Sequence, residues 1–209
     1  MPLLLPLLEN NEIIAGLWEI TEPIEELILQ VPKYIQSAPS FSSDLRLQQW
    51  YAGRALIHKL AILKGMNEVK LHNDDNGKIC FSDHCYNLSL SHKPQYSIAI
   101  LSEIMKVGID MEEILPRIAK IGPRVLSESE MEDAGASIEK LTVYWCVKEV
   151  LYKIYSKRAL SFKENLIVIP FEFKNEQGNC IGKIKTTDFE GIYNIKYLKK
   201  GNYIIAYNQ

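Results

Sequence analysis

Several familiar signatures are missing from this 209-residue sequence, and each absence excludes a class of protein. There is no Walker A or GxGxxG loop, so a nucleotide ligand would have to be held by side chains rather than by a glycine-rich backbone. The lack of a GxSxG elbow argues against a serine hydrolase built on that turn. No run approaches the ~18 apolar residues of a membrane helix, which predicts a soluble protein without membrane contact.

The sequence also has little net charge and few cysteines. Its formal net charge of -2 supplies no field that would attract nucleic acid or an anionic membrane. The four cysteines show no CxxC spacing, which is typical of reduced thiols and predicts a cytoplasmic protein. The opening MPLLLPLLENNE lacks the basic start of a signal peptide and contains two prolines, so we expect a strand or packing arm there.

What is present is typical of a soluble globular protein, with 47% hydrophobic and 24% charged residues. Hydrophobic periodicity predicts the same order of elements twice, helices followed by a meander of short strands. In the first half we expect a strand, two helices and then four strands, at 12–20, 22–30, 45–64, 68–72, 78–81, 86–91 and 96–101; a fifth strand, at 106–112, follows from the boundary between the halves. In the second half we expect helices and then four strands, at 116–136, 138–158, 166–173, 180–187, 191–198 and 203–207. The predicted fold is two similar α+β halves, residues 1–105 and 106–209, each a helix packed on an antiparallel sheet.

The segment GIDME at 108–112 carries two acids on a predicted strand. Asp110 and Glu112 are two residues apart, so their side chains point to the same face, with α-carbons roughly 7 Å apart. One hard cation could bridge two such carboxylates. A pair of acids at a solvated strand end is the alternative interpretation.

A second segment, WCVKEVLYK at 145–153, lies on the predicted long helix. Glu149 and Lys153 are one turn apart on one face, away from the apolar stripe, where the alternative is an ordinary surface ion pair. Trp145 is also on that side, and a tryptophan there requires a second surface to cover it. Three acids with nearby lysines suit Mg²⁺ and phosphate chemistry.

Further phosphate-binding candidates lie in the first half. Ser91, His92 and Lys93 offer a hydroxyl, an imidazole and an ammonium group at the end of an alternating strand. A Ser/His nucleophile pair is disfavoured, because adjacent strand residues point to opposite faces. Lys78 follows the tight turn DDNG, and Arg54 lies on the first long helix; surface solvation is the default for each.

Taken together and in order, these motifs resemble the 4'-phosphopantetheinyl transferase superfamily, specifically its longer, Sfp-type members. The resemblance runs over the RAL helix with Arg54, the NGK turn with Lys78, the LSH strand and GIDME. It continues through VLSxxE, with Ser127 and Glu130, to WxxKExxxK. Lys93, Cys146 and Val150 depart from the usual pattern, but none of these changes removes an acid.

The resemblance implies roles for these residues. Asp110, Glu112 and Glu149 would bind Mg²⁺, or Mn²⁺ in its place. Six residues would contact coenzyme A: Arg54, Lys78, Ser91, His92, Lys148 and Lys153. The catalytic set would be Glu149, Lys153, Asp110 and Glu112, with Glu149 the expected general base and Glu112 the alternative. The family fold implies two halves related by a pseudo-twofold axis, with the active site between them.

The activity implied is transfer of 4'-phosphopantetheine from coenzyme A to a serine of an apo acyl carrier protein or of a carrier domain of a synthase. Adenosine 3',5'-bisphosphate would be released, and a monomer is expected. Two alternatives remain open from the residues. A metal-dependent phosphodiester hydrolase acting on a nucleotide-like substrate could use the same acids, and a non-enzymatic module could merely bind a carrier protein.

Overall fold

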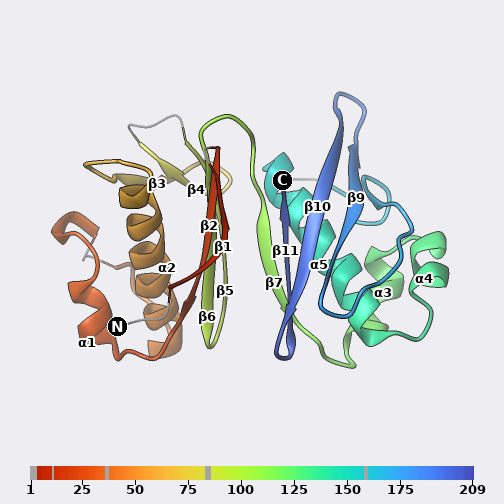
Figure 1. The fold of residues 1–209 in the computed structure, drawn as a ribbon, viewed down its shortest axis with the longest axis horizontal. Helices are drawn as coiled ribbons and strands as arrows, with labels where there is room; N and C mark the ends of the chain where they lie inside the picture. Colours follow the sequence, from red (N-terminus) through yellow and green to blue (C-terminus); the bar gives the residue numbers. More distant parts are fainter. Residues whose placement is uncertain (1–3, 11, 36–37, 83–85, 158–159) are drawn as a thin grey trace. The chain divides into compact units, whose positions relative to one another are not determined.

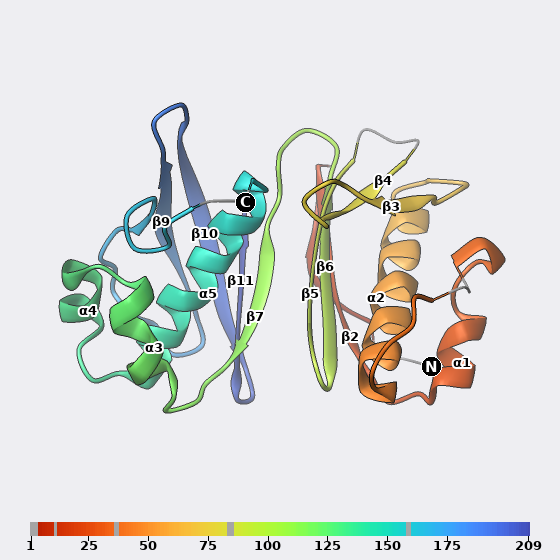
Figure 2. The same ribbon diagram turned by 180° about the vertical axis from the view of Figure 1, so that it is seen from behind.

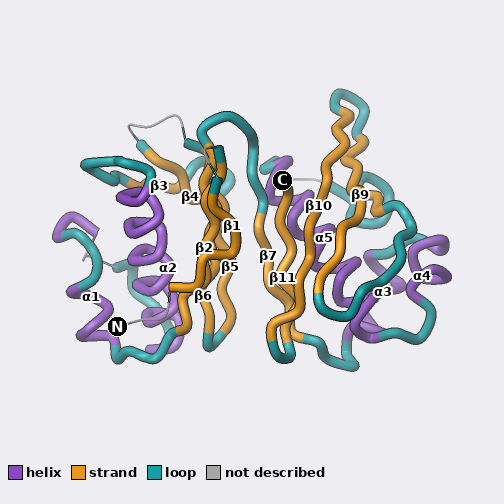
Figure 3. Tube along the Cα trace, in the orientation of Figure 1, coloured by secondary structure: helices purple, strands orange, loops and turns teal. Residues whose placement is uncertain are grey.

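Two compact units make up the chain, Met1–Lys106 (unit 1) and Val107–Gln209 (unit 2). The computed structural model describes residues 4–10, 12–35, 38–82, 86–157 and 160–209. Within those ranges, no helix is long and apolar enough to cross a membrane. Each unit is a mixture of helices and antiparallel strands, shown by type in Figure 3.

Unit 1 is built on a four-stranded antiparallel sheet with the strand order β1-β2-β6-β5. Its strands are β1 (Leu4–Glu9), β2 (Ile13–Glu19), β5 (Asn87–Lys93) and β6 (Tyr96–Ser102). A separate small hairpin is formed by β3 (Leu71–Asn73) and β4 (Ile79–Phe81). The helices are α1 (Ile24–Leu29), a 3-10 turn at Lys33–Ile35, and α2 (Asp44–Leu63).

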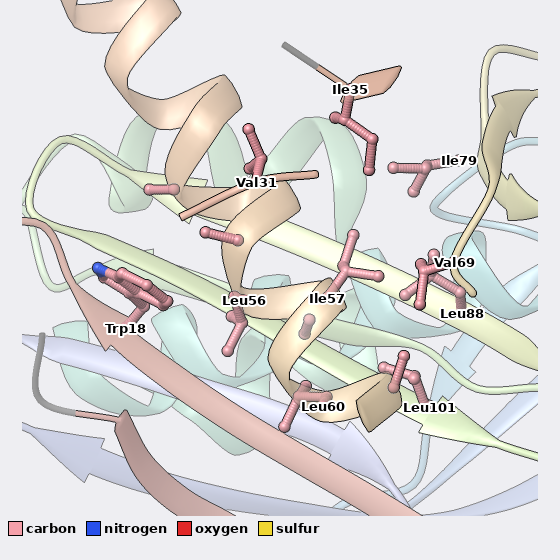
Figure 4. Close-up of a cluster of buried hydrophobic side chains, with 14 of the residues drawn as sticks. Trp18, Val31, Ile35, Leu56, Ile57, Leu60, Val69, Ile79, Leu88 and Leu101 are labelled. Atoms are coloured by element: carbon pink, nitrogen blue, oxygen red, sulfur yellow. The ribbon is translucent and has the colours of Figure 1, made fainter. Parts of the chain in front are cut away.

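The long helix α2 lies along one face of this sheet (Figure 1). Ser43 caps its first turn by accepting a hydrogen bond from the backbone N–H of Arg46, and small buried residues along α2 allow it to approach the strands. Figure 4 shows the resulting core, to which α2 contributes Leu56 and the sheet contributes Trp18 and Leu101. Burying these apolar side chains is the main force that holds unit 1 together.

Unit 2 has a five-stranded antiparallel sheet with the order β7-β11-β10-β9-β8. The strands are β7 (Ile109–Glu113), β8 (Leu166–Val168), β9 (Gln177–Lys185), β10 (Glu190–Lys200) and β11 (Tyr203–Asn208). Its helices are α3 (Ile118–Val125), α4 (Glu128–Ala134) and α5 (Ile138–Tyr155). Figure 2 shows α5 running across the sheet, with α3 and α4 beside its first half.

Helix α5 approaches the start of β7 more closely than most side chains would permit. A Cβ added at Gly108 would lie 2.4 Å from the Val150 carbonyl oxygen and 3.0 Å from a carbon of Ile154. The Gly108 N–H donates a hydrogen bond to the Asn208 side chain at 2.8 Å, which ties the entry of β7 to the last residue of β11. The glycine of GIDME is therefore required by backbone packing.

The predicted α+β class with antiparallel sheets is confirmed, while the similarity of the two halves stays a prediction. The strand predicted over 166–173 is much shorter than expected and ends at Val168. Pro170 has no backbone N–H to donate to a neighbouring strand, so it cannot continue the ladder of hydrogen bonds. The apolar residues Phe171 and Phe173 instead pack against Tyr197, with ring centroids 5.7 and 6.0 Å apart.

We expect Gly108→Ala to destabilise unit 2 by about 3 kcal/mol, because the added methyl group would press on a backbone carbonyl that cannot move aside. Gly65→Ala is the matched control. Gly65 has a φ of +79°, and a Cβ added there would have no heavy atom within 4 Å, so only backbone strain of about 1 kcal/mol is expected. Urea unfolding of both variants measures the difference, and equal losses would contradict the close packing.

Candidate functional site

Two of the three acids of β7, Asp110 and Glu112, face helix α5. Asp110 is paired across the ladder with Ala206, and Glu112 with Ile204. Directly opposed residues of an antiparallel pair share one face, and both partners belong to the core that α5 covers. The predicted same-face placement of the two acids is therefore present, on the α5 side of the sheet. Asp110 is buried and Glu112 half-buried.

Lys153 of α5 reaches back to β7. Its ammonium group donates to the Asp110 carboxylate at 2.7 Å and to the Ile109 carbonyl at 2.8 Å. The Lys153 side chain is 24% exposed and that of Asp110 only 6%, so the pair lies at the edge of the core. Glu149, one turn earlier on α5, is half-buried. The structure thus brings residues of GIDME and WCVKEVLYK into direct contact.

The three acids carry the right donor chemistry for a hard divalent cation, since carboxylate oxygens are the ligands that Mg²⁺ prefers. They are not, however, gathered into one cluster. Over the described ranges, no group of three or more His, Cys, Asp or Glu side chains is arranged to hold a metal ion. Asp110 instead makes its ion pair with the Lys153 ammonium. The metal set of Asp110, Glu112 and Glu149 therefore stays a prediction.

Lys148 has a different place from the one expected of a phosphate contact. Its side chain is fully buried, and its ammonium group lies 2.8 Å from the Glu130 carboxylate. It also donates to the carbonyls of Phe162 at 2.7 Å and Leu166 at 2.6 Å. These three bonds use all three N–H groups of the ammonium. Burial lowers the pKa of Lys148, while the Glu130 carboxylate opposes that shift. The geometry supports a structural role for Lys148 rather than contact with coenzyme A.

The surface that Trp145 requires is provided by the segment after α5. The Phe162 ring stacks between Trp145 and Tyr152, with centroids 5.4 and 5.2 Å apart. Trp145, Lys148 and Tyr152 form a stripe at helical spacing, and the segment containing Phe162 covers it. The second surface expected for Trp145 is therefore present, and it is aromatic.

In unit 1, Arg54 lies on α2 with its guanidinium group 4.0 Å from the centre of the Trp50 ring. Burial lowers the pKa of Arg54 to about 10, so the group stays protonated at neutral pH. At the neighbouring Gly53, an added Cβ would be 3.1 Å from Leu90, which shows how closely α2 approaches β5 here. Arg54 is therefore a charged group held on a packed helix.

Ser91 and His92 lie on opposite sides of β5. Leu88 and Leu90 face the core under α2, so His92 at the next even position is on the α2 side and exposed. Ser91 is buried on the other face. The strand places Arg54 and His92 on the same side of the sheet, but it does not present Ser91 and His92 to a single point.

Lys78 follows the β3–β4 turn, which is fixed by one side chain. The Asp74 carboxylate accepts hydrogen bonds from the backbone N–H groups of Asn76 and Lys78, at 2.9 and 2.8 Å. Gly77 takes a φ of +85°, which favours glycine. The sequence DDNGK therefore sets the backbone position of Lys78, as its turn chemistry predicts.

Glu130 is the residue whose role sequence reasoning left open. The VLSxxE motif begins α4 as a capping box, in which Ser127 and Glu130 each bond the other's backbone N–H, at 3.2 and 2.7 Å. A capping glutamate is usually exposed, whereas Glu130 is 2% exposed and ion-paired to Lys148. The sequence pattern of a capping box does not indicate that its glutamate also forms a buried ion pair.

Residues 106–208 match the family model described as the 4'-phosphopantetheinyl transferase superfamily. The matched region begins with the segment that leads into β7 and ends at the last residue of β11. No curated protein matches the chain.

We expect Lys153→Met to lower the free energy of unfolding by about 1–3 kcal/mol, because it leaves the buried Asp110 carboxylate without its ammonium partner. Lys157→Met is the matched control. Lys157 pairs with Asp188 at 4.0 Å, but both side chains are about two-thirds exposed, and such pairs contribute little to stability. Thermal unfolding at low and high salt checks this; equal effects would show that the Asp110 pair is not a core contact.

Proposed function

We propose that this protein, whose residues 106–208 form a domain of the 4'-phosphopantetheinyl transferase superfamily, moves the 4'-phosphopantetheine group of coenzyme A onto a serine of an apo carrier protein. The superfamily supports phosphopantetheine transfer in general. The observation that carries the specific proposal is the contact between the family's two signature segments, made by Asp110 of GIDME and Lys153 of WCVKEVLYK.

The reaction is a phosphoryl transfer. The hydroxyl oxygen of the acceptor serine attacks the β-phosphorus of coenzyme A and forms the new P–O bond. The bond from that phosphorus to the bridging oxygen breaks, and adenosine 3',5'-bisphosphate leaves. Positioning and charge neutralisation supply most of the rate enhancement in such reactions, because the enzyme forms no covalent bond to the transferred group.

The acids and the lysines have different roles in this reaction. We assign Asp110, Glu112 and Glu149 to a divalent cation, Mg²⁺ with Mn²⁺ as a substitute, because their donor chemistry fits it. When bound, that cation would neutralise charge on the pyrophosphate oxygens. Lys153 is the lysine we assign to the phosphates, since its side chain is partly exposed and its ammonium group lies beside Asp110. Lys148 is left out of this set because its three donors are bonded inside the core.

The serine proton needs an acceptor. We assign Glu149 as the general base, acting directly or through a water molecule, and retain Glu112 as the alternative. Both side chains are half-buried, so neither is fully withdrawn from an incoming hydroxyl group. The two are distinguishable by substitution, since only the base should change the pH dependence of turnover as well as its rate.

Unit 1 would supply the contacts to coenzyme A. We assign Arg54, Lys78, Ser91 and His92 to this cosubstrate, with His92 and the two basic residues favouring its 3'-phosphate end. Arg54 is the firmest of these candidates, because packing against Trp50 fixes its guanidinium group. We further propose the long, Sfp-type form of the superfamily with two similar halves, acting as a cytoplasmic monomer.

Incubation with coenzyme A, Mg²⁺ and a panel of apo acyl and peptidyl carrier proteins tests the proposal by intact mass. We expect a carrier to gain one phosphopantetheine group on its serine, with loss of the gain after chelation and recovery when Mg²⁺ or Mn²⁺ is returned. Disappearance of coenzyme A without a modified carrier would support phosphodiester hydrolysis instead. Carrier binding without any turnover would favour the non-enzymatic module.

We expect Asp110→Ala and Glu149→Gln each to reduce transfer by at least about 100-fold, since each removes a carboxylate that we assign to the reaction. The matched control is Glu113→Gln. Glu113 directly follows Glu112 in β7, so its side chain points to the face of the sheet opposite Asp110 and Glu112. Glu113→Gln should keep near-normal turnover. Thermal unfolding establishes that all three variants are folded, and near-normal turnover of either of the first two at limiting Mg²⁺ would reject the metal assignment.

A further inference from the structure

Glu130 is the centre of a buried polar network in unit 2. One carboxylate oxygen accepts from the backbone N–H of Ser127 at 2.7 Å, and it also contacts the Lys148 ammonium at 2.8 Å. The other accepts from the backbone N–H of Val168 at 2.8 Å. The carboxylate therefore joins the start of α4, the middle of α5 and the end of β8.

Lys148 completes the network from the helix side. Its ammonium group bonds Glu130 and the carbonyls of Phe162 and Leu166, and the side chain has no exposed surface. Every polar atom of this buried pair thus has a partner, which is the condition under which burial of two charges is tolerated. Four segments of the unit converge on these two side chains.

This arrangement fixes helix α5 in two respects. The Lys148 ammonium can reach its three acceptors only when the helix has one rotation about its axis. The positions of the acceptors also fix where the helix lies along that axis. Successive residues are about 100° apart around a helix, so fixing Lys148 also fixes the direction of Glu149. Lys153 lies about 7.5 Å further along the axis, and the same rotation of the helix sets its direction. Its contact with Asp110 on β7 is the observed result.

We propose that Glu130 and Lys148 are positioning residues, which set the rotation of α5 and so the direction of Glu149 and the contact of Lys153 with Asp110 on β7. The inference deepens the proposed function and rests on it. Neither residue touches a substrate. The pair acts through the adjacent residue Glu149 and through Lys153, and it explains why the VLSxxE and WxxKE segments carry an acid and a base at these two places.

A buried ion pair is a poor source of stability, because desolvation offsets most of the attraction between the charges. Removing one partner is costly, but replacing both by uncharged groups of similar size is often nearly neutral. This asymmetry allows orientation to be tested separately from folding. Glu130→Gln combined with Lys148→Met removes both charges and keeps the approximate volume of both side chains.

Lys140→Met is the matched control. Lys140 also lies on α5 and bonds α4, through the Asp133 carboxylate and carbonyl at 2.9 Å each, and its side chain is 12% exposed. It lies nine residues before Glu149, about 13 Å along the helix. Loss of this contact weakens the same pair of helices without disturbing the network at Lys148.

Two measurements decide the inference. In the double variant, we expect kcat with a carrier protein to fall at least about 10-fold while the KM for coenzyme A changes less than about threefold, because misplacement acts on the reacting geometry. Amide hydrogen exchange in residues 149–155 should become at least about 10-fold faster. In the control, kcat and exchange in that stretch should match the wild type, even where thermal stability is lowered equally.

The outcomes separate the inference from the proposed function. Unchanged kcat and unchanged exchange in a folded double variant would overturn the inference, as would equal effects in Lys140→Met. If the double variant does not fold, Glu130→Asp replaces it; this change keeps both charges and withdraws the carboxylate by one methylene, so the same loss of kcat is expected. If the wild-type protein modifies no carrier, the proposed function is wrong. The hydrogen-exchange rates alone would then test whether Glu130 and Lys148 orient α5.

Discussion

The site in unit 2 depends on the direct contact between the backbone of α5 and the start of β7. Only a glycine fits at position 108, because the Val150 carbonyl oxygen would be 2.4 Å from a Cβ there. This close approach brings the Lys153 ammonium within hydrogen-bonding distance of Ile109 and Asp110. A wider spacing, as between ordinary side chains of a helix and a sheet, would leave the two signature segments apart.

Contact alone does not determine which residues of α5 face the sheet. A helix can rotate or slide on an apolar surface at modest cost, because dispersion and burial are not directional. Hydrogen bonds to charged groups are directional, and a buried charge left unpaired is expensive. The network around Glu130 and Lys148 therefore adds an orientation to a contact whose strength comes from Val147, Val150 and Leu151 in the core.

The sequence predicts the parts of this arrangement that follow from periodicity. Strand alternation places Asp110 and Glu112 on one face, and helical spacing places Glu149 with Lys153. It does not predict the fate of Lys148, because that depends on acceptors from the later segment at Phe162 and Leu166. Trp145 and Tyr152 are the one available signal, since aromatic residues at helical spacing on both sides of Lys148 indicate a covered stripe. The separation of Ser91 from His92 follows from strand geometry, whereas the burial of Ser91 requires the fold.

Two lysines five residues apart on α5 thus have opposite physical situations. Lys148 is fixed by three acceptors inside the core, so any movement would break charged hydrogen bonds in a medium of low dielectric constant. Lys153 lies at the edge of the core with part of its side chain reaching solvent. An anionic ligand can attract the second without unfolding anything, because water can replace contacts that a partly exposed cation gives up. Burial therefore separates a rigid lysine, which we propose orients the helix, from an adaptable lysine, which we propose contacts the ligand.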